Sequence, residues 1–246
     1  MDEKRREEIA LFRYQVIAPL LYVEPGRGAL KKAIECAPER PYYAYRLGAL
    51  YLAVRDYRAA EHYFRIAVEI EPMDAFYRFR LGDAFFGQGK WELAAQEYEN
   101  VLNWFYDRQF KVPLELKATC APHYNRILRQ RAREEGRKVD FATFGTSAVS
   151  RGCLGGQGFV FVSHTGQVQP CGYLDLNCGQ VREKDFAEIY RTSPTFLKLR
   201  DKGAYQGKCP ICEYFQVCGG CRARAYEATG DFLAEEPLCL YQPQAV

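Results

Sequence analysis

The sequence lacks the long apolar runs, the charge excess and the secretory leader that would assign it to a membrane, nucleic-acid-binding or secreted class. No stretch approaches the roughly 18 consecutive apolar residues of a membrane-spanning helix. Lys and Arg number 34 against 31 Asp and Glu, an excess too small to indicate nucleic-acid binding. The charged start MDEKRREEIALFRYQ has no apolar core or cleavage site. We therefore expect a cytoplasmic protein with neither a membrane nor a nucleic-acid partner.

Cysteine is scarce in the first part of the chain and dense in the second. Of ten cysteines in 246 residues, Cys36 alone precedes residue 105. Clustered cysteines in a cytoplasmic protein more often bind metal or perform redox chemistry than form disulfides. The length fits one or two domains, and 48% apolar residues suffice for a folded core. Composition thus predicts a two-part protein whose second part depends on its cysteines.

Residues 41–104 contain a sequence repeat with a period of 34 residues. The aligned pairs are Leu47/Leu81, Gly48/Gly82, Tyr51/Phe85, Ala60/Ala94 and Phe64/Tyr98. Each unit predicts two helices, with turns at residues 56–57 and 90–91. The pattern resembles the tetratricopeptide repeat, so all-α helical hairpins are expected over residues 29–104. That resemblance implies either a groove for a protein partner or a helical spacer. Residues 1–28 predict a further helix of unassigned role.

After residue 104 the pattern changes to mixed elements. Residues 112–119 predict a strand, and Ala121-Pro122 opens a predicted helix through ILRQRAREEGRK. FVFVSHTGQVQPC predicts a β-hairpin with strands at residues 159–162 and 168–171. Ser193-Pro194 predicts a helix start. RARAYEATG predicts another helix.

The cysteines of the second part are ordered around one dense motif. That motif is C-x2-C-x5-C-x2-C, formed by Cys209, Cys212, Cys218 and Cys221, and Cys239 follows it. Thiolates separated by two residues reach one metal centre from a tight turn. Zinc ribbons usually place about 12 or more residues between their pairs, so the short separation favours an iron–sulfur site. A single zinc ion would also leave three cysteines without a role, namely Cys153, Cys171 and Cys178.

This order of cysteines resembles the SPASM domain, the auxiliary-cluster module of many radical S-adenosylmethionine enzymes. LKATCAPHYNRILRQRAREEG, RGCLGGQGFVFVSHTGQVQPCGYL and CPICEYFQVCGGCRARAYEATGDFLAEEPLC are similar to the C-terminal part of the radical haem-biosynthesis enzymes, of the iron-coproporphyrin decarboxylase and haem d1 type. The resemblance implies a barrel remnant at residues 105–145 and a SPASM-like domain at 146–246. The expected fold class is α+β multidomain. It combines helical hairpins with a small cysteine-rich domain that has a β-hairpin and short helices.

The resemblance further implies one or two 4Fe–4S clusters. The first would be held by Cys209, Cys212, Cys218 and Cys239. A second would use Cys153, Cys171 and Cys221, with Cys178 as a candidate fourth ligand. The last gap of the dense motif is two residues where the family usually has three. If the chain holds a single cluster, Cys221 and Cys239 are alternative fourth ligands. Cys36 and Cys120 are predicted to be bystanders.

The sequence contains no C-x3-C-x2-C triplet, the motif that holds the radical-generating cluster in these enzymes. S-adenosylmethionine binding is therefore not expected in this chain, and no catalytic residue is assigned. The expected role is electron transfer or an auxiliary one, with a porphyrin-pathway substrate or partner enzyme as candidate partners. Whether the chain keeps enzymatic activity stays open.

The main alternative is a tetratricopeptide adaptor with a structural zinc site in its tail. A disulfide-stapled secreted domain is the third interpretation. Arg222 and Arg224 are candidates to neutralise cluster charge or bind a propionate. Their two-residue spacing on a helix predicts that at least one faces solvent. His123 is expected to be an ordinary surface residue or a cofactor contact.

Overall fold

The computed structural model describes residues 26–114 and 116–244. The chain divides into two compact units, Met1–Val101 and Leu102–Val246. Of the predicted helix in residues 1–28, all but the last three residues lie outside the described part. Within the described residues, no helix combines the length and the apolar character needed to cross a bilayer.

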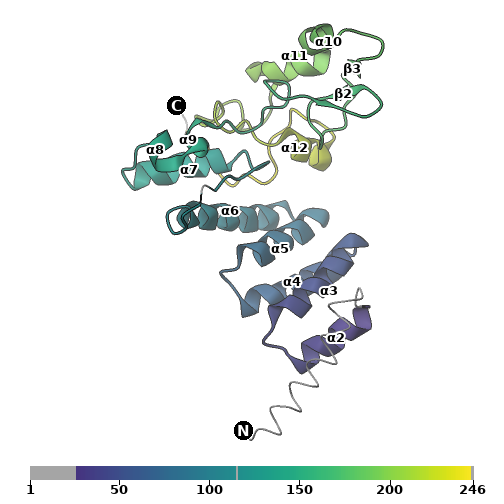
Figure 1. Ribbon diagram of the computed structural model, residues 1–246, viewed down its shortest axis with the longest axis vertical. Coiled ribbons are helices and arrows are strands. Elements are labelled where there is room, and N and C mark those ends of the chain that lie inside the picture. The colour runs from purple at the N-terminus through teal and green to yellow at the C-terminus, as the bar shows by residue number, and fades with distance from the viewer. Residues whose placement is uncertain (1–25, 115, 245–246) are drawn as a thin grey trace, which may run out of the picture. The chain divides into compact units, whose positions relative to one another are not determined.

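The first unit is helical, as the repeat predicts (Figure 1). Its helices are α2 (Arg27–Cys36), α3 (Pro41–Ala53), α4 (Tyr57–Ile70), α5 (Ala75–Gly87) and α6 (Trp91–Arg108), the last of which continues into the second unit. Both predicted turns are confirmed, because α4 begins at Tyr57 and α6 at Trp91. The side chains of Asp56 and Asp74 accept backbone N–H bonds at the starts of α4 and α5, which satisfies donors that have no partner within the helix.

Small residues set the distance between the paired helices. A Cβ on Gly48 of α3 would lie 2.7 Å from two ring atoms of Phe64 on α4. A Cβ on Gly82 of α5 would lie 3.1 Å from the ring of Tyr98 on α6. The aligned glycines of the two units therefore contact the aligned aromatics. Leu47, Leu81, Ala60 and Ala94 are all buried, as expected for core positions.

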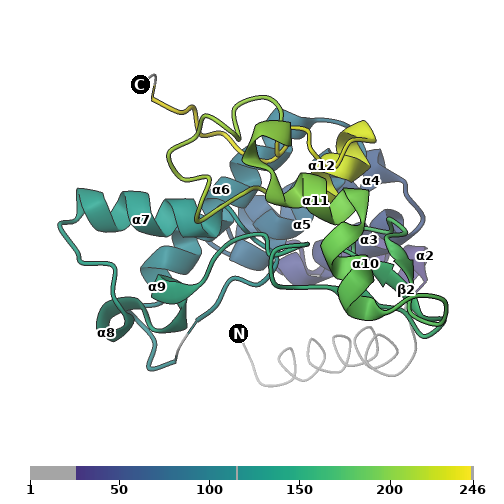
Figure 2. The same cartoon turned by 90° about the horizontal axis from the view of Figure 1, so that it is seen from above.

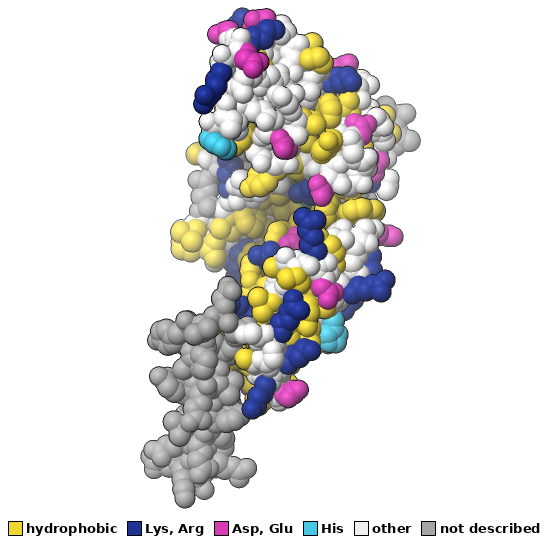
Figure 3. Space-filling model, turned by 90° about the vertical axis from the view of Figure 1, so that its right-hand side faces the viewer, with side chains coloured by type: hydrophobic (Ala, Val, Ile, Leu, Met, Phe, Trp, Pro, Cys, Tyr) yellow, Lys and Arg dark blue, Asp and Glu magenta, His cyan; other side chains and the backbone are white. Residues whose placement is uncertain are grey.

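One face of this unit carries a cationic recess. Figure 3 shows more Lys and Arg than acidic side chains over the helical unit. The recess is lined by residues including Arg55, Arg58, Arg65, Glu61 and Lys90. Glu61 pairs with both Arg65 and Lys90, at 2.9 and 2.6 Å, so it offsets part of the positive charge.

Gly48→Ala is expected to destabilise the chain by about 1–3 kcal/mol, because the added methyl group overlaps an aromatic ring in a packed core. Gly28→Ala on α2 is the matched control, since nothing lies within 4 Å of its added Cβ. It should be neutral or up to about 1 kcal/mol more stable. Urea unfolding followed by circular dichroism measures both. A Gly48→Ala protein as stable as the wild type would contradict this packing.

The second unit contains short helices and one small sheet. Its elements are α7 (Tyr124–Glu134), α8 (Phe141–Phe144), α9 (Thr146–Val149), β1 (Phe161–Val162), β2 (Gln167–Gln169), β3 (Gly179–Gln180), α10 (Phe186–Thr192), α11 (Pro194–Arg200), a 3-10 turn (Lys202–Ala204) and α12 (Arg222–Thr229). Figures 1 and 2 both place α7–α9 at one side of this unit and α10, α11 and the strands at the other.

The predicted β-hairpin is confirmed, with shorter strands. β1 and β2 pair antiparallel with Phe161 opposite Gln169 and Val162 opposite Val168. β3, which sequence patterning missed, pairs antiparallel with the other edge of β2. The predicted helices at α7, α11 and α12 are present.

The strand predicted at residues 112–119 is wrong. Residues 112–114 and 116–119 form bends and irregular backbone. A strand needs a neighbour for its backbone N–H and C=O groups, and the sheet of the described residues contains β1–β3 alone. Because no strand of the described residues pairs with this segment, its apolar composition does not produce a strand.

Two apolar cores stabilise this unit. One packs α7 against the end of α6 and contains Leu102, Tyr106, Tyr124, Ile127, Leu128, Ala132 and Phe144. The other packs β2 against α10 and α11 and contains Val168, Ile189, Phe196 and Leu199. Residues 205–221 and 230–244 have no helix or strand, so the loops that carry most of the cysteines depend on specific polar contacts.

Candidate metal centre

Four of the predicted ligands line one pocket. Its lining includes Cys209, Cys212, Cys218 and Cys239. The aromatic side chains of Tyr214, Phe215 and Tyr241 form part of its wall. Cys221, the alternative fourth ligand, does not line this pocket. The structure therefore brings together the ligand set that the resemblance implies for a first cluster.

Tight turns place the first three cysteines around the pocket. The backbone N–H of Cys212 donates to the Cys209 carbonyl at 3.2 Å, and that of Cys218 donates to the Tyr214 carbonyl at 2.9 Å. Gly219 and Gly220 then adopt φ values of 68° and 61°, a conformation that side chains disfavour. The two glycines reverse the chain between Cys218 and Cys221, so that the two cysteines face different surroundings.

The pocket is a desolvated environment for thiols. Burial raises the pKa of the Cys218 thiol to about 12. It also raises the pKa values of the Cys212 and Cys239 thiols. Iron and zinc bind thiolates, so a metal must displace these protons when it binds.

Two cations offset the charge that such thiolates would carry. Arg126 of α7 lines the pocket, and its side chain lies over the Tyr241 ring, 5.3 Å from the centroid. Its charge opposes the rise in pKa that burial causes at Cys239. Lys208 donates to the Cys239 carbonyl at 2.7 Å. Because Arg126 is 3% exposed, water screens its charge poorly. Sequence reasoning missed Arg126, although it lies in the family-like segment LKATCAPHYNRILRQ.

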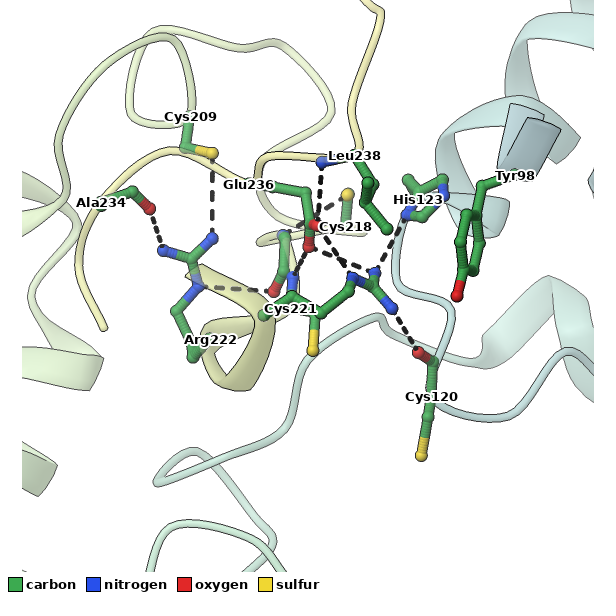
Figure 4. Close-up of polar contacts among 12 residues, drawn as sticks. Tyr98, Cys120, His123, Cys209, Cys218, Cys221, Arg222, Ala234, Glu236 and Leu238 are labelled. Atoms are coloured by element: carbon green, nitrogen blue, oxygen red, sulfur yellow. Dashed lines mark hydrogen bonds and ion pairs between the residues drawn. The ribbon is translucent and has the colours of Figure 1, made fainter. Parts of the chain in front are cut away.

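Arg222 is buried behind the dense motif (Figure 4). Its guanidinium donates to the carbonyls of Ala234 at 2.7 Å and Phe232 at 3.2 Å. One N–H group also approaches the Cys209 sulfur at 3.9 Å. Hydrogen bonds to a cluster's sulfurs are among the factors that set its potential.

Glu236 and Arg224 form a buried ion pair beside Cys221 (Figure 4). Arg224 donates to the two Glu236 oxygens at 2.9 and 3.2 Å. Glu236 also accepts the backbone N–H groups of Cys221 and Leu238. Burial alone would raise the Glu236 pKa, but the charge and hydrogen bonds of Arg224 outweigh it and lower that pKa. The prediction that Arg222 or Arg224 faces solvent is wrong, since the loop at residues 232–236 supplies partners for both.

His123 lies next to this pair and is fully buried. Its Nδ1 is 3.4 Å from an Arg224 nitrogen. Burial, with the Arg224 charge, lowers the pKa of His123 to about 3. The imidazole is therefore neutral near pH 7, and the expectation of a plain surface residue is wrong.

The remaining predicted ligands fall into two places. Burial raises the pKa values of the Cys171 and Cys221 thiols, and the charge of Cys153 contributes to the rise in both. Cys178 lies elsewhere, packed against the core of β2, α10 and α11, with its sulfur 3.6 Å from the Leu176 carbonyl. The structure does not bring Cys178 to the group it was predicted to complete.

A single metal ion and an iron–sulfur cluster require different distances between the ligating sulfurs. Among the described residues, no three His, Cys, Asp or Glu side chains gather closely enough to hold one metal ion. Zinc brings each sulfur to about 2.3 Å from one point. A 4Fe–4S cluster gives each thiolate its own iron, so its ligands surround a volume. Four thiols around one pocket, with an arginine beside them, fit a cluster of that kind.

Comparison with known proteins assigns the same class to this region. Residues 153–222 match the SPASM domain, an iron–sulfur cluster-binding domain. This part of the chain is therefore similar to an iron–sulfur cluster-binding domain, and it lies within a region that is similar to AdoMet-dependent heme synthases.

The matching relatives include AdoMet-dependent heme synthases, a pre-heme d1 synthase and PqqA peptide cyclases. The chain is 61% identical to the AdoMet-dependent heme synthase of Nitratidesulfovibrio vulgaris over 152 residues, which are 62% of this chain and 41% of that protein. It is 49% identical over 180 residues to the AdoMet-dependent heme synthase of Methanosarcina barkeri, covering 73% of this chain and 51% of that protein. The pre-heme d1 synthase of Dinoroseobacter shibae is 34% identical over 92 residues, 36% of this chain and 23% of that protein. The chain thus spans about half or less of the relatives it matches.

Glu236→Gln is expected to cost about 3–5 kcal/mol of stability, because it leaves Arg224 as a buried charge without its anionic partner. Urea denaturation of the metal-free chain measures the loss. Glu227→Gln is the control, an exposed carboxylate on the same helix α12, and it should change stability by less than about 0.5 kcal/mol. Equal effects of the two variants would show that the ion pair contributes no stability.

Proposed function

We propose that this chain binds a 4Fe–4S cluster through Cys209, Cys212, Cys218 and Cys239 and uses it for electron transfer. The observation that carries the proposal is the shared pocket of these four thiols, with the buried Arg126 beside them. A four-cysteine 4Fe–4S site is anionic, so a nearby buried cation favours its binding and its reduction. The match to an iron–sulfur domain supports this choice over zinc.

We further propose that the chain does not itself generate radicals from S-adenosylmethionine. Its cysteine spacings include no C-x3-C-x2-C triplet. The cluster would then pass electrons to or from a partner, and the enzymes of haem biosynthesis are the candidate partners because the similar proteins carry those names.

The helices α3–α6 are proposed to be tetratricopeptide hairpins that dock such a partner protein. Gly48 with Phe64 and Gly82 with Tyr98 make equivalent contacts in the two repeat units, which supports a common hairpin design. The cationic recess around Arg55 and Arg58 favours an acidic segment of the partner.

Metal analysis of the anaerobically purified full chain tests the cluster proposal. We expect iron and sulfide in equal amounts, at least about four of each per chain, and no stoichiometric zinc. Cys209→Ala should lose about four irons, because a cluster deprived of a thiolate is released. Cys36→Ala, an exposed cysteine of the first unit, should keep the wild-type content. One zinc per chain without sulfide would contradict the proposal and support the adaptor alternative.

Arg126→Gln is expected to lower the midpoint potential of this cluster by several tens of millivolts. The variant removes a buried positive charge that favours the reduced, more negative state. A redox titration followed by electron paramagnetic resonance (EPR) measures the shift. Arg133→Gln removes an exposed charge from the same helix, and solvent screening should leave the potential nearly unchanged. Equal shifts in both variants would exclude a specific role for Arg126.

A further inference from the structure

The cysteines of the second unit divide about the buried Glu236 carboxylate. In Figure 4 the thiols of Cys209 and Cys218 lie on one side of this carboxylate, and those of Cys221 and Cys120 point to the other. The first pair lines the pocket described above, and the second pair does not. A second group of thiols therefore exists on the far side of the ion pair.

Backbone contacts place Cys153 beside the dense motif and near the segment that precedes Cys171. The Cys153 N–H donates to the Cys218 carbonyl at 3.0 Å, which joins its segment to the start of the Gly-Gly turn. A Cβ on Gly155 would lie 3.6 Å from both the Cys153 sulfur and the Pro170 carbonyl oxygen. Cys153 and the residue before Cys171 thus lie beside the same glycine.

Cys120 is tied to the same place from a distant part of the sequence. Arg224 lies on α12, three residues after Cys221. Its guanidinium donates to the Cys120 carbonyl at 3.3 Å. Cys120 is exposed. Burial raises the pKa of the Cys171 thiol, and the charge of Cys120 makes a small contribution in the same direction. Cys120 and Arg55 are the two residues other than glycine with positive φ in the described chain, at 58° and 60°. Such backbone is uncommon and clusters at functional sites.

We propose that Cys120 is the fourth ligand of a second iron–sulfur cluster whose other ligands are Cys153, Cys171 and Cys221. The inference rests on the iron–sulfur function proposed above and replaces Cys178 as the completing ligand. Each thiol gives its proton to solvent as it binds iron. Two ferrous ions, two ferric ions and four sulfides together supply the 2+ core of a 4Fe–4S cluster, so no further oxidant is needed. Cys120 is exposed and lies in a turn. Cys178, in contrast, packs among Val168, Ile189 and other apolar side chains.

The test uses the full chain reconstituted anaerobically with ferrous iron, ferric iron and sulfide. The wild type should bind about eight irons and eight sulfides, two 4Fe–4S clusters. Cys171→Ala should lose about half of both. Cys120→Ala should fall to the same level, or give a three-iron EPR signal in the oxidised state that the wild type lacks. Cys178→Ala is the matched control and should keep the wild-type iron content and spectrum.

Different failures are distinguishable. A wild type with about four irons, all of which Cys209→Ala removes, would leave the first cluster in place and overturn the second. Wild-type iron content and spectrum in Cys120→Ala, or a loss in Cys178→Ala equal to that in Cys171→Ala, would overturn the assignment of Cys120. A chain without iron and sulfide would overturn both proposals. Cys120→Ser, which keeps the side-chain size, serves as the second variant, and circular dichroism checks that each protein is folded.

Discussion

The buried ion pair between Arg224 and Glu236 is the interaction on which the cysteine-rich region depends. The loops around it have few backbone ladders of their own, so polar side chains must position them. One carboxylate accepts the N–H groups of Cys221 and Leu238 as well as the guanidinium. The guanidinium also holds the carbonyl of Cys120. Burying either charge without a partner would cost too much free energy. Through the hydrogen bonds just described, the ion pair holds three separate segments together.

This arrangement places positive charge where anionic clusters would need it. Arg126 lines the first pocket, and Arg222 approaches the Cys209 sulfur from behind the dense motif. Both guanidinium groups are buried, so water screens their charges less than it screens those of exposed side chains. The same network separates Cys218 from Cys221, although two glycines alone lie between them. Within one sequence motif, Cys218 therefore lines the pocket and Cys221 does not.

Local signals in the sequence predicted much of this structure. The 34-residue repeat located four helices, Asp56 marked a helix start, and the alternating residues around residue 165 located the hairpin. The family resemblance implied a set of four thiols that the fold places around one pocket.

Features that depend on distant partners were not predictable. The strand expected at residues 112–119 has no neighbour to pair with, and β3 is too short to leave a pattern. The two-residue spacing of Arg222 and Arg224 predicts only how the two side chains are placed around their own helix. It gives no information on the loop that packs against that helix. The sequence predicts a bystander at Cys120 and gives no sign of its contact with Arg224, which lies about a hundred positions later in the chain.

X-ray absorption at the iron and zinc edges of the anaerobically purified full chain tests the central claim most directly. The account predicts iron with an all-sulfur first shell and a short iron–iron distance, the signature of a cluster rather than an isolated ion. Zinc surrounded by four sulfurs, with no metal–metal scattering and no iron, would contradict it.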